Sequence, residues 1–338
     1  MKHKRILLSL IIFILCILGY RFYLYISKSF SSSYNQLSSN EYIQTTNSED
    51  INTADNVTKY DLSFAVLGDV HDNEADFQDA LDDIKSTDII LDALVLNGDT
   101  VDQGIDSQYK TITSVLNNNK DKLPDKIIKN IGNHEFYNYD NSNKSSDDVN
   151  EKIQKYLNFA DEEKVYHDTW IKGYHFISLG SEDGNSPTCN STTAYISNEQ
   201  IQWLKEKLTE DYEKGRPIFI FLHQPIMLNW GWGDIPGTNV STELNDILSQ
   251  YPEAVLFNSH THKQMSNECL NTDNNYTVAQ TGAVSYTLFI NSDSTLSRDF
   301  SYINGLYVTV SGNNVNISGR DLKNHKWILS KDLIFKEQ

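Results

Sequence analysis

The residues in this sequence that could perform chemistry are acids, histidines and an asparagine, each placed just after a short apolar run. They lie in the motifs Gly68-Asp69-Val70-His71, Gly98-Asp99, Gly132-Asn133-His134-Glu135, His223 and His260-Thr261-His262. The candidate ligands are two carboxylates, four histidines and one amide, namely Asp69, Asp99, His71, His223, His260, His262 and Asn133. Oxygen and nitrogen ligands without sulfur suit Mn, Fe or Zn better than a thiolate site or a pure calcium cage. The motifs therefore predict a metal centre.

Two of the motifs place their candidate ligands two residues apart. Alternate side chains of an extended segment point to the same side, so Asp69 and His71 are expected to bind one cation. His260 and His262 repeat this spacing. Asp99 follows a glycine at the end of an apolar run, and its two carboxylate oxygens could bridge two cations.

The apolar runs that precede these motifs are short and bounded by turn residues, which is typical of strands buried on both faces. The expected strands are 62–67, 93–96, 126–131, 217–222 and 254–257. Helices are expected between them at 74–84, 107–116, 148–159 and 198–212. This alternation predicts a layered α/β architecture whose ligands meet beyond the carboxyl ends of the strands. After His262, the segments 276–279, 305–310, 315–318 and 327–335 are expected to be antiparallel strands that complete a second sheet.

The order and content of these motifs resemble the calcineurin-like metallophosphoesterase family. The resemblance runs from about Leu62 to His262 and depends on all the motifs together, because a single Asp-x-His is common by chance. It implies an α/β fold, a layered αββα sandwich of two mixed sheets flanked by helices. It also implies an enzyme that uses two divalent metal ions to hydrolyse phosphoric esters.

Individual roles are carried over from the family by position. The resemblance implies that one metal is held by Asp69, His71 and His262. It implies that the second is held by Asn133, His223 and His260, and that both share Asp99. His134 is then not a ligand but a catalytic residue that faces the substrate. Ser259 stands where the family usually has glycine, so a slightly altered turn is expected before His260.

The resemblance also implies a mechanism. Two cations held about 3.5–4 Å apart would produce a bridging hydroxide that attacks the phosphorus of a phosphomonoester or phosphodiester. A protonated His134 would stabilise charge or protonate the leaving oxygen. The alternatives are a catalytically silent metal-binding or interaction module of the same fold, and a nuclease. The formal net charge of -18 disfavours nucleic acid as a partner and leaves a small phosphorylated substrate open.

Aromatic side chains near the motifs are candidate substrate contacts. Trp230 and Trp232 each precede a glycine shortly after His223, and Tyr137 follows the Asn133-His134 pair. Such rings could stack on a base, a sugar or an aryl leaving group. The alternative is that they only pack their loops against the protein.

The N-terminal residues predict export from the cytoplasm. Residues 1–27 combine a basic start with a long apolar run, which fits a signal anchor or a signal peptide. Residues 28–59 have the polar composition of a flexible linker, and residues 60–338 form the expected catalytic domain. The protein is expected to be membrane-anchored and to face outside the cytoplasm, or to be secreted if the leader is cleaved. Outside the cytoplasm Cys189 and Cys269 could pair, but the sequence leaves this open.

Overall fold

The computed structural model describes residues 60–140, 145–184, 189, 192–226, 239–291 and 295–336. The predicted leader and linker, residues 1–59, lie outside this described part, as do Trp230 and Trp232. None of the helices within the described ranges is both long enough and apolar enough to cross a membrane. Cys189 and Cys269 are both described, and no disulfide joins them.

The first sheet has six strands and is half parallel and half antiparallel. Its order is β14-β13-β12-β1-β2-β3. The strands are β1 (Leu62–Leu67), β2 (Ala93–Asn97), β3 (Lys126–Asn130), β12 (Asn304–Ser311), β13 (Asn314–Asp321) and β14 (Lys326–Ile334). β1, β2 and β3 run parallel, whereas β12 pairs antiparallel with β1 and continues into the β13 and β14 meander.

The second sheet also has six strands, in the order β4-β5-β6-β7-β9-β8. They are β4 (His167–Ile171), β5 (Tyr174–Ser178), β6 (Ile218–Phe221), β7 (Ala254–Asn258), β8 (Leu270–Asn271) and β9 (Thr277–Gln280). The four strands β5, β6, β7 and β9 are parallel, and each edge strand is antiparallel. A separate two-stranded sheet pairs β10 (Thr287–Ile290) with β11 (Leu296–Asp299).

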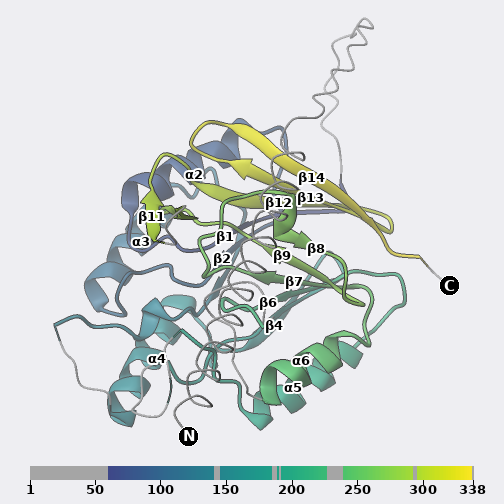
Figure 1. Cartoon of the computed structure of the whole chain (residues 1–338), viewed down its shortest axis with the longest axis horizontal. Coiled ribbons are helices and arrows are strands. Elements are labelled where there is room, and N and C mark those ends of the chain that lie inside the picture. Colours follow the sequence, from purple (N-terminus) through teal and green to yellow (C-terminus); the bar gives the residue numbers. More distant parts are fainter. Residues whose placement is uncertain are drawn as a thin grey trace, which may run out of the picture. The chain divides into compact units, whose positions relative to one another are not determined.

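Helices cover the outer faces of the two sheets, as Figure 1 shows. They are α2 (Glu74–Ser86), α3 (Asp106–Asn118), α4 (Ser146–Ala160), α5 (Asn198–Thr209) and α6 (Asn239–Leu248), with short 3-10 turns η1 (His134–Phe136) and η2 (Asn267–Cys269). Asn73, Ser145 and Ser197 begin α2, α4 and α5, each accepting a hydrogen bond from a backbone N–H of the first turn. Apolar side chains of α2, α3 and α4 pack on the first sheet, and those of α5 and α6 pack on the second.

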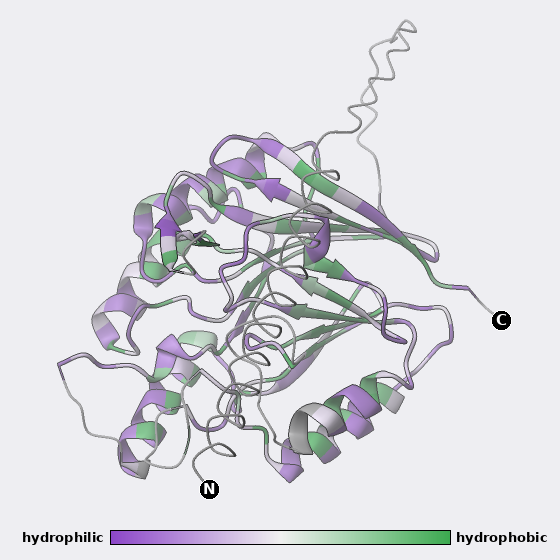
Figure 2. Ribbon diagram, viewed as in Figure 1, coloured by the Kyte–Doolittle hydropathy of each residue, from purple (hydrophilic) through white to green (hydrophobic). Residues whose placement is uncertain are grey.

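The two sheets pack face to face over a core rich in phenylalanine. Phe64 of β1 contacts Phe176 and Phe219 of the second sheet edge-to-face, with ring centroids 4.9 and 4.8 Å apart. Figure 2 shows the apolar residues concentrated along the strands, while the helices carry both kinds of residue. The predicted αββα sandwich is therefore confirmed.

The prediction for the C-terminal strands was wrong in its topology. β12, β13 and β14 do not complete the second sheet but extend the first, because β12 pairs with β1 from Leu62↔Val310 to Val66↔Leu306. β9 does belong to the second sheet, yet it runs parallel to β7. An apolar run reveals that a strand is buried but not which partner it takes, and β1 offered an open edge.

A buried ion pair fastens α2 to the C-terminal strands. The Asp83 carboxylate is fully buried and accepts hydrogen bonds from Arg320 Nε at 2.7 Å and Nη2 at 2.9 Å. The Tyr307 hydroxyl donates to the same carboxylate at 3.2 Å. Removing the acid would leave a buried guanidinium without its partner.

Asp83→Ala should therefore destabilise the fold by about 3–5 kcal/mol, the range for breaking a buried pair. The neighbouring Asp82→Ala is the matched control, because Asp82 is on the surface, where it forms an ion pair with Lys122 at 2.7 Å, and its removal should cost less than about 1 kcal/mol. Urea denaturation followed by circular dichroism measures both. Equal losses in the two variants would contradict the structural role of Asp83.

Candidate metal centre

The predicted site residues converge because each follows the carboxyl end of a parallel strand. Asp69 and His71 come after β1, Asp99 after β2, and Asn133 and His134 after β3. His223 follows β6, and His260 and His262 follow β7. Both sheets therefore contribute ligands to the centre. Apart from Trp230 and Trp232, which lie outside the described residues, the predicted site residues are brought together.

Asp69, His71 and His262 form the first group of potential ligands. Asp69 Oδ1 lies 3.4 Å from His262 Nε2 and 3.8 Å from His71 Nε2. The two imidazole Nε2 atoms are only 3.0 Å apart. Asp69 Oδ1 is buried and accepts no hydrogen bond from the described residues. Buried carboxylate oxygens are rarely left without a partner, so a cation fits this position.

Asn133, His223 and His260 form the second group. Asn133 Oδ1 lies 3.2 Å from His223 Nε2 and 2.7 Å from His260 Nδ1. The amide nitrogen of Asn133 donates to the Tyr137 hydroxyl at 3.1 Å, which turns the amide oxygen toward the imidazoles. His223, His260 and Asp99 also satisfy the spacing of a metal site by themselves.

Asp99 lies between the two groups. Its Oδ2 is 3.1 Å from His223 Nε2 in the second group and 3.9 Å from His71 Nε2 in the first. Its Oδ1 accepts a hydrogen bond from the His134 backbone N–H at 2.7 Å. Both site carboxylates are essentially buried. Asp99 therefore lies where a carboxylate must lie in order to contact both cations.

The backbone of the ligand motifs differs from the extended form predicted from the i, i+2 spacing. Asp69, His71, Asp99, His260 and His262 all have positive φ, between 49° and 70°. Their side chains converge through left-handed turns and not through strand pleating. Such conformations cost roughly 1–3 kcal/mol each in non-glycine residues and concentrate at functional sites.

Backbone carbonyls fix the orientation of two ligand imidazoles. His223 Nδ1 lies 2.9 Å from the Asn97 carbonyl oxygen, and His262 Nδ1 lies 2.9 Å from that of Tyr286. A carbonyl can only accept, so each Nδ1 carries the hydrogen and donates it. In the neutral imidazole this leaves the lone pair on Nε2, pointing into the centre.

Glycines beside the ligands provide room for them. Gly98 has a φ of +84°, and a Cβ there would lie 2.5 Å from His223 Nδ1. A Cβ on Gly68 would lie 2.3 Å from Ser259 Oγ. Ser259 is buried and its hydroxyl accepts hydrogen bonds from Asn97 Nδ2 at 3.0 Å and Thr281 Oγ1 at 2.8 Å. Serine at this position is therefore part of the packing behind His260.

Glu135 is a structural residue of the site whose role the sequence analysis missed. Its buried carboxylate accepts hydrogen bonds from the backbone N–H groups of Asp99, Thr100 and Gly132 at 3.1, 2.9 and 2.7 Å. It thereby ties the loop after β2 to the loop after β3. The signal was present, since Glu135 directly follows Asn133-His134, but a sequence does not reveal which backbone groups an acid will contact.

Asp102 holds the candidate catalytic histidine. Its carboxylate Oδ1 lies 3.2 Å from His134 Nδ1, and its backbone carbonyl lies 2.9 Å from the same nitrogen. Tyr137 packs its ring against His134 at a centroid distance of 4.5 Å. Tyr137 thus contacts both Asn133 and His134, while its predicted contact with substrate stays a prediction.

Burial and the site carboxylates shift the pKa values of the histidines in opposite directions, and which effect prevails differs from one histidine to the next. Burial disfavours the charged form of His71, but the neighbouring carboxylates of Asp102 and Asp69, 3.6 and 3.8 Å from its ring nitrogens, outweigh it and raise the pKa to about 10. Burial likewise opposes the effect of Asp99 on His223, whose pKa is raised to about 9. Burial dominates at His260 and His262 and lowers each pKa to about 4.

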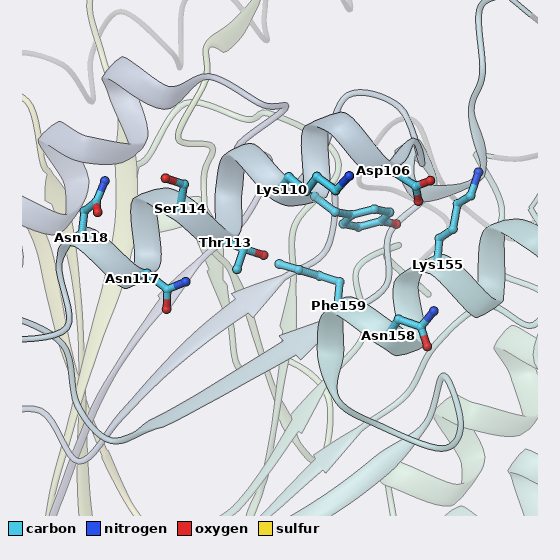
Figure 3. A pocket seen from close by; sticks show the side chains of 10 residues that line it. Asp106, Lys110, Thr113, Ser114, Asn117, Asn118, Lys155, Asn158 and Phe159 are labelled. Atoms are coloured by element: carbon cyan, nitrogen blue, oxygen red, sulfur yellow. The ribbon is translucent and has the colours of Figure 1, made fainter.

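A separate groove lies between α3 and α4 (Figure 3). It has a volume of about 710 Å³, and its lining includes Lys110, Lys155, Asn158 and Phe159. None of the predicted metal ligands lines it. The candidate centre is therefore defined by converging side chains and not by this groove.

Two packed mixed sheets with a histidine and carboxylate centre at their strand ends define a metallophosphoesterase. A family model described as calcineurin-like phosphoesterase matches residues 62–264, which is more than half of the chain. The chain belongs to the calcineurin-like phosphoesterase family. The family predicted from the sequence is confirmed, and a phosphoesterase is the class of enzyme that the matching family model describes.

Individual relatives are more distant. A probable cyclic nucleotide phosphodiesterase from Ruthia magnifica subsp. Calyptogena magnifica is 25% identical over 182 residues, which span 53% of this chain and 65% of that relative. A dimetal phosphatase from Danio rerio has a TM-score of 0.58 at 13% identity, covering 82% of this chain and all of that one. A purple acid phosphatase from yellow lupin (Lupinus luteus) seeds has a TM-score of 0.57 at 12% identity, covering 81% and 53%. At such identities the two solved structures show the shared fold.

Cation binding to this centre should release protons. A histidine must lose its proton to offer a lone pair, and His71 and His223, with pKa values of about 10 and 9, carry protons at neutral pH. We expect about two protons to be released per chain at pH 7.5, and the apparent affinity for Mn²⁺ to fall as the pH falls. Calorimetric titrations in buffers of different ionisation enthalpy measure this number. Binding without net proton release would contradict the role of these two histidines as ligands.

Proposed function

We propose that this protein hydrolyses phosphoesters with two divalent cations held by its seven converging side chains. The observation that carries the proposal is the pair of buried carboxylates, Asp69 and Asp99, surrounded by imidazole nitrogens and an amide oxygen. One cation would be held by Asp69, His71 and His262. The other would be held by Asn133, His223 and His260, with Asp99 shared. The donor set of oxygen and imidazole nitrogen suits Mn, Fe or Zn.

The cations would neutralise the phosphate oxygens and activate the attacking water when bound. The chain's own residues set up the rest of the reaction. Asp102 and its carbonyl hold His134 by Nδ1, which leaves Nε2 available to carry a proton toward the leaving oxygen. His134 is 18% exposed by its side chain, so it can meet both substrate and solvent. Glu135 fixes the loops that carry Asp99 and His134.

The substrate is proposed to be a small phosphomonoester or phosphodiester. Similarity to a relative described as a probable cyclic nucleotide phosphodiesterase makes a cyclic nucleotide a sensible diester to test. The direct test is release of nitrophenol from 4-nitrophenyl phosphate and bis(4-nitrophenyl) phosphate, with a cyclic nucleotide assayed beside them. Hydrolysis should require added Mn²⁺, Fe²⁺ or Zn²⁺ and should stop with chelator. A fully metal-loaded protein that hydrolyses none of these esters would favour the silent binding module.

His134→Ala should keep the bound metal but lower kcat by about 10²- to 10⁴-fold, the usual contribution of a general acid or base. The reason is that the His134 side chain faces the site without belonging to either ligand group. Metal content by mass spectrometry and steady-state kinetics give the two readouts. A His134→Ala variant that has lost its metal would show that the assigned role is wrong.

Asp99→Ala should instead lose metal and activity together, because Asp99 is the carboxylate that both groups share. The same two measurements apply. Retention of two metals per chain with wild-type turnover would contradict the shared role.

We also propose that the catalytic domain works outside the cytoplasm. The basic start and the apolar run within residues 1–27 support this proposal. Labelling of intact cells with an impermeant reagent would detect the domain from outside. Protection of the domain until the cells are lysed would contradict it.

A further inference from the structure

A small hairpin lies directly against the first metal-ligand group. β10 begins beside His262, since the Leu288 backbone N–H donates to the His262 carbonyl at 2.8 Å. Leu288 also forms a bridge with Lys263. Tyr286 immediately precedes β10, and the backbone N–H of Ser285 donates to the Asp69 carbonyl at 3.0 Å. The hairpin of β10 and β11 is therefore anchored to the centre by backbone hydrogen bonds on both ligand loops.

Tyr286 links the ligand histidine to an arginine on the second strand of the hairpin. The Tyr286 ring stacks on the His262 imidazole with centroids 4.0 Å apart and an interplanar angle of 18°. The Arg298 guanidinium carbon lies over the same ring, 4.4 Å from its centroid. Because His262 covers one face of the ring, the guanidinium occupies the other. Arg298 is thus held within about 8.4 Å of the His262 ring by these two contacts.

Arg298 differs from the other arginines of the described chain. Arg216 pairs with Glu213 at 2.7 Å, and Arg320 pairs with Asp83 at 2.7 Å. Arg298 is exposed, and among the described residues it makes no ion pair and no hydrogen bond, although the chain is strongly acidic. Its planar fork of N–H donors is held in place by an aromatic ring while its hydrogen-bonding capacity is unused. Such an arrangement suits recognition of an external anion.

We propose that Arg298 is a specificity residue that binds a second anionic group of the substrate. This inference rests on the proposed phosphoesterase function. The Tyr286 ring separates the guanidinium from His262. The guanidinium is therefore placed to contact a group on the leaving alcohol of the substrate, and not the phosphorus, which the metal ligands surround. Phe300, which is 56% exposed and 5.7 Å from Tyr286 by ring centroids, gives the intervening part an apolar wall. The substrate class is then a phosphoester whose alcohol carries a further carboxylate or phosphate.

Two aryl esters that differ by one anionic group test this directly. Phenyl phosphate and 4-carboxyphenyl phosphate are compared with wild type, Arg298→Gln and Arg298→Lys, each loaded with Mn²⁺. Arg298→Gln should lower kcat/KM for the carboxylated ester about tenfold, as expected for loss of a hydrogen bond between charged groups. It should change kcat/KM for phenyl phosphate by less than about twofold, because phenyl phosphate has no second anionic group for the guanidinium to bind. Arg298→Lys should recover part of the kcat/KM lost for the carboxylated ester, since lysine keeps the positive charge but not the planar set of guanidinium donors.

Arg216→Gln is the matched control, because Arg216 precedes β6 at the end of the sheet opposite to His223. It should leave the ratio of the two kcat/KM values unchanged. An unchanged ratio in Arg298→Gln, or an equal loss with both esters, would overturn the inference while leaving the phosphoesterase function intact. Failure of the metal-loaded wild type to hydrolyse either ester would overturn the proposed function and this inference with it.

Discussion

The burial of two carboxylates at the ends of neighbouring strands is the constraint on which the rest of the structure depends. Asp69 follows β1 and Asp99 follows the adjacent parallel strand β2, and both side chains are shielded from water. An isolated buried carboxylate costs several kcal/mol, and two like charges close together cost more. Burial raises the pKa of Asp99, yet His223 and His134 hold it well below its usual range. Positive charge must therefore be present at the centre, as protonated histidine before metal binds and as metal cation afterwards.

The two sheets meet this constraint by supplying ligands from opposite sides. The first sheet delivers two acids, an amide and His71, and the second delivers His223, His260 and His262. Left-handed turns at five ligand positions turn these side chains inward, and backbone hydrogen bonds such as His71 N–H to the Asp99 carbonyl at 2.9 Å support the turns. Glu135 joins two of the ligand loops. The stability of the packed sheets thus compensates for the backbone strain and the buried carboxylate charge at the centre.

The layered fold and the convergence of the ligands were predictable from the sequence because both depend on local patterns. Each ligand ends a buried apolar run, and parallel strands bring such ends together. What could not be predicted depends on partners distant in sequence. The pairing of β12 with β1, the three backbone donors to Glu135, and the stacking of Tyr286 on His262 are examples. The i, i+2 spacing correctly predicted which ligands lie close together, but it predicted an extended backbone where the structure has left-handed turns. Spacing alone does not distinguish these two conformations.

The central claim is that Asp99 is shared by two cations, and anomalous scattering from Mn²⁺-soaked crystals tests it most directly. We expect two peaks about 3.5–4 Å apart, one beside Asp69, His71 and His262 and the other beside Asn133, His223 and His260. Asp99 should contact both. His71, Asp102 and His134 form a competing group that could also hold an ion. A single peak at that group, with no density bridged by Asp99, would contradict the account.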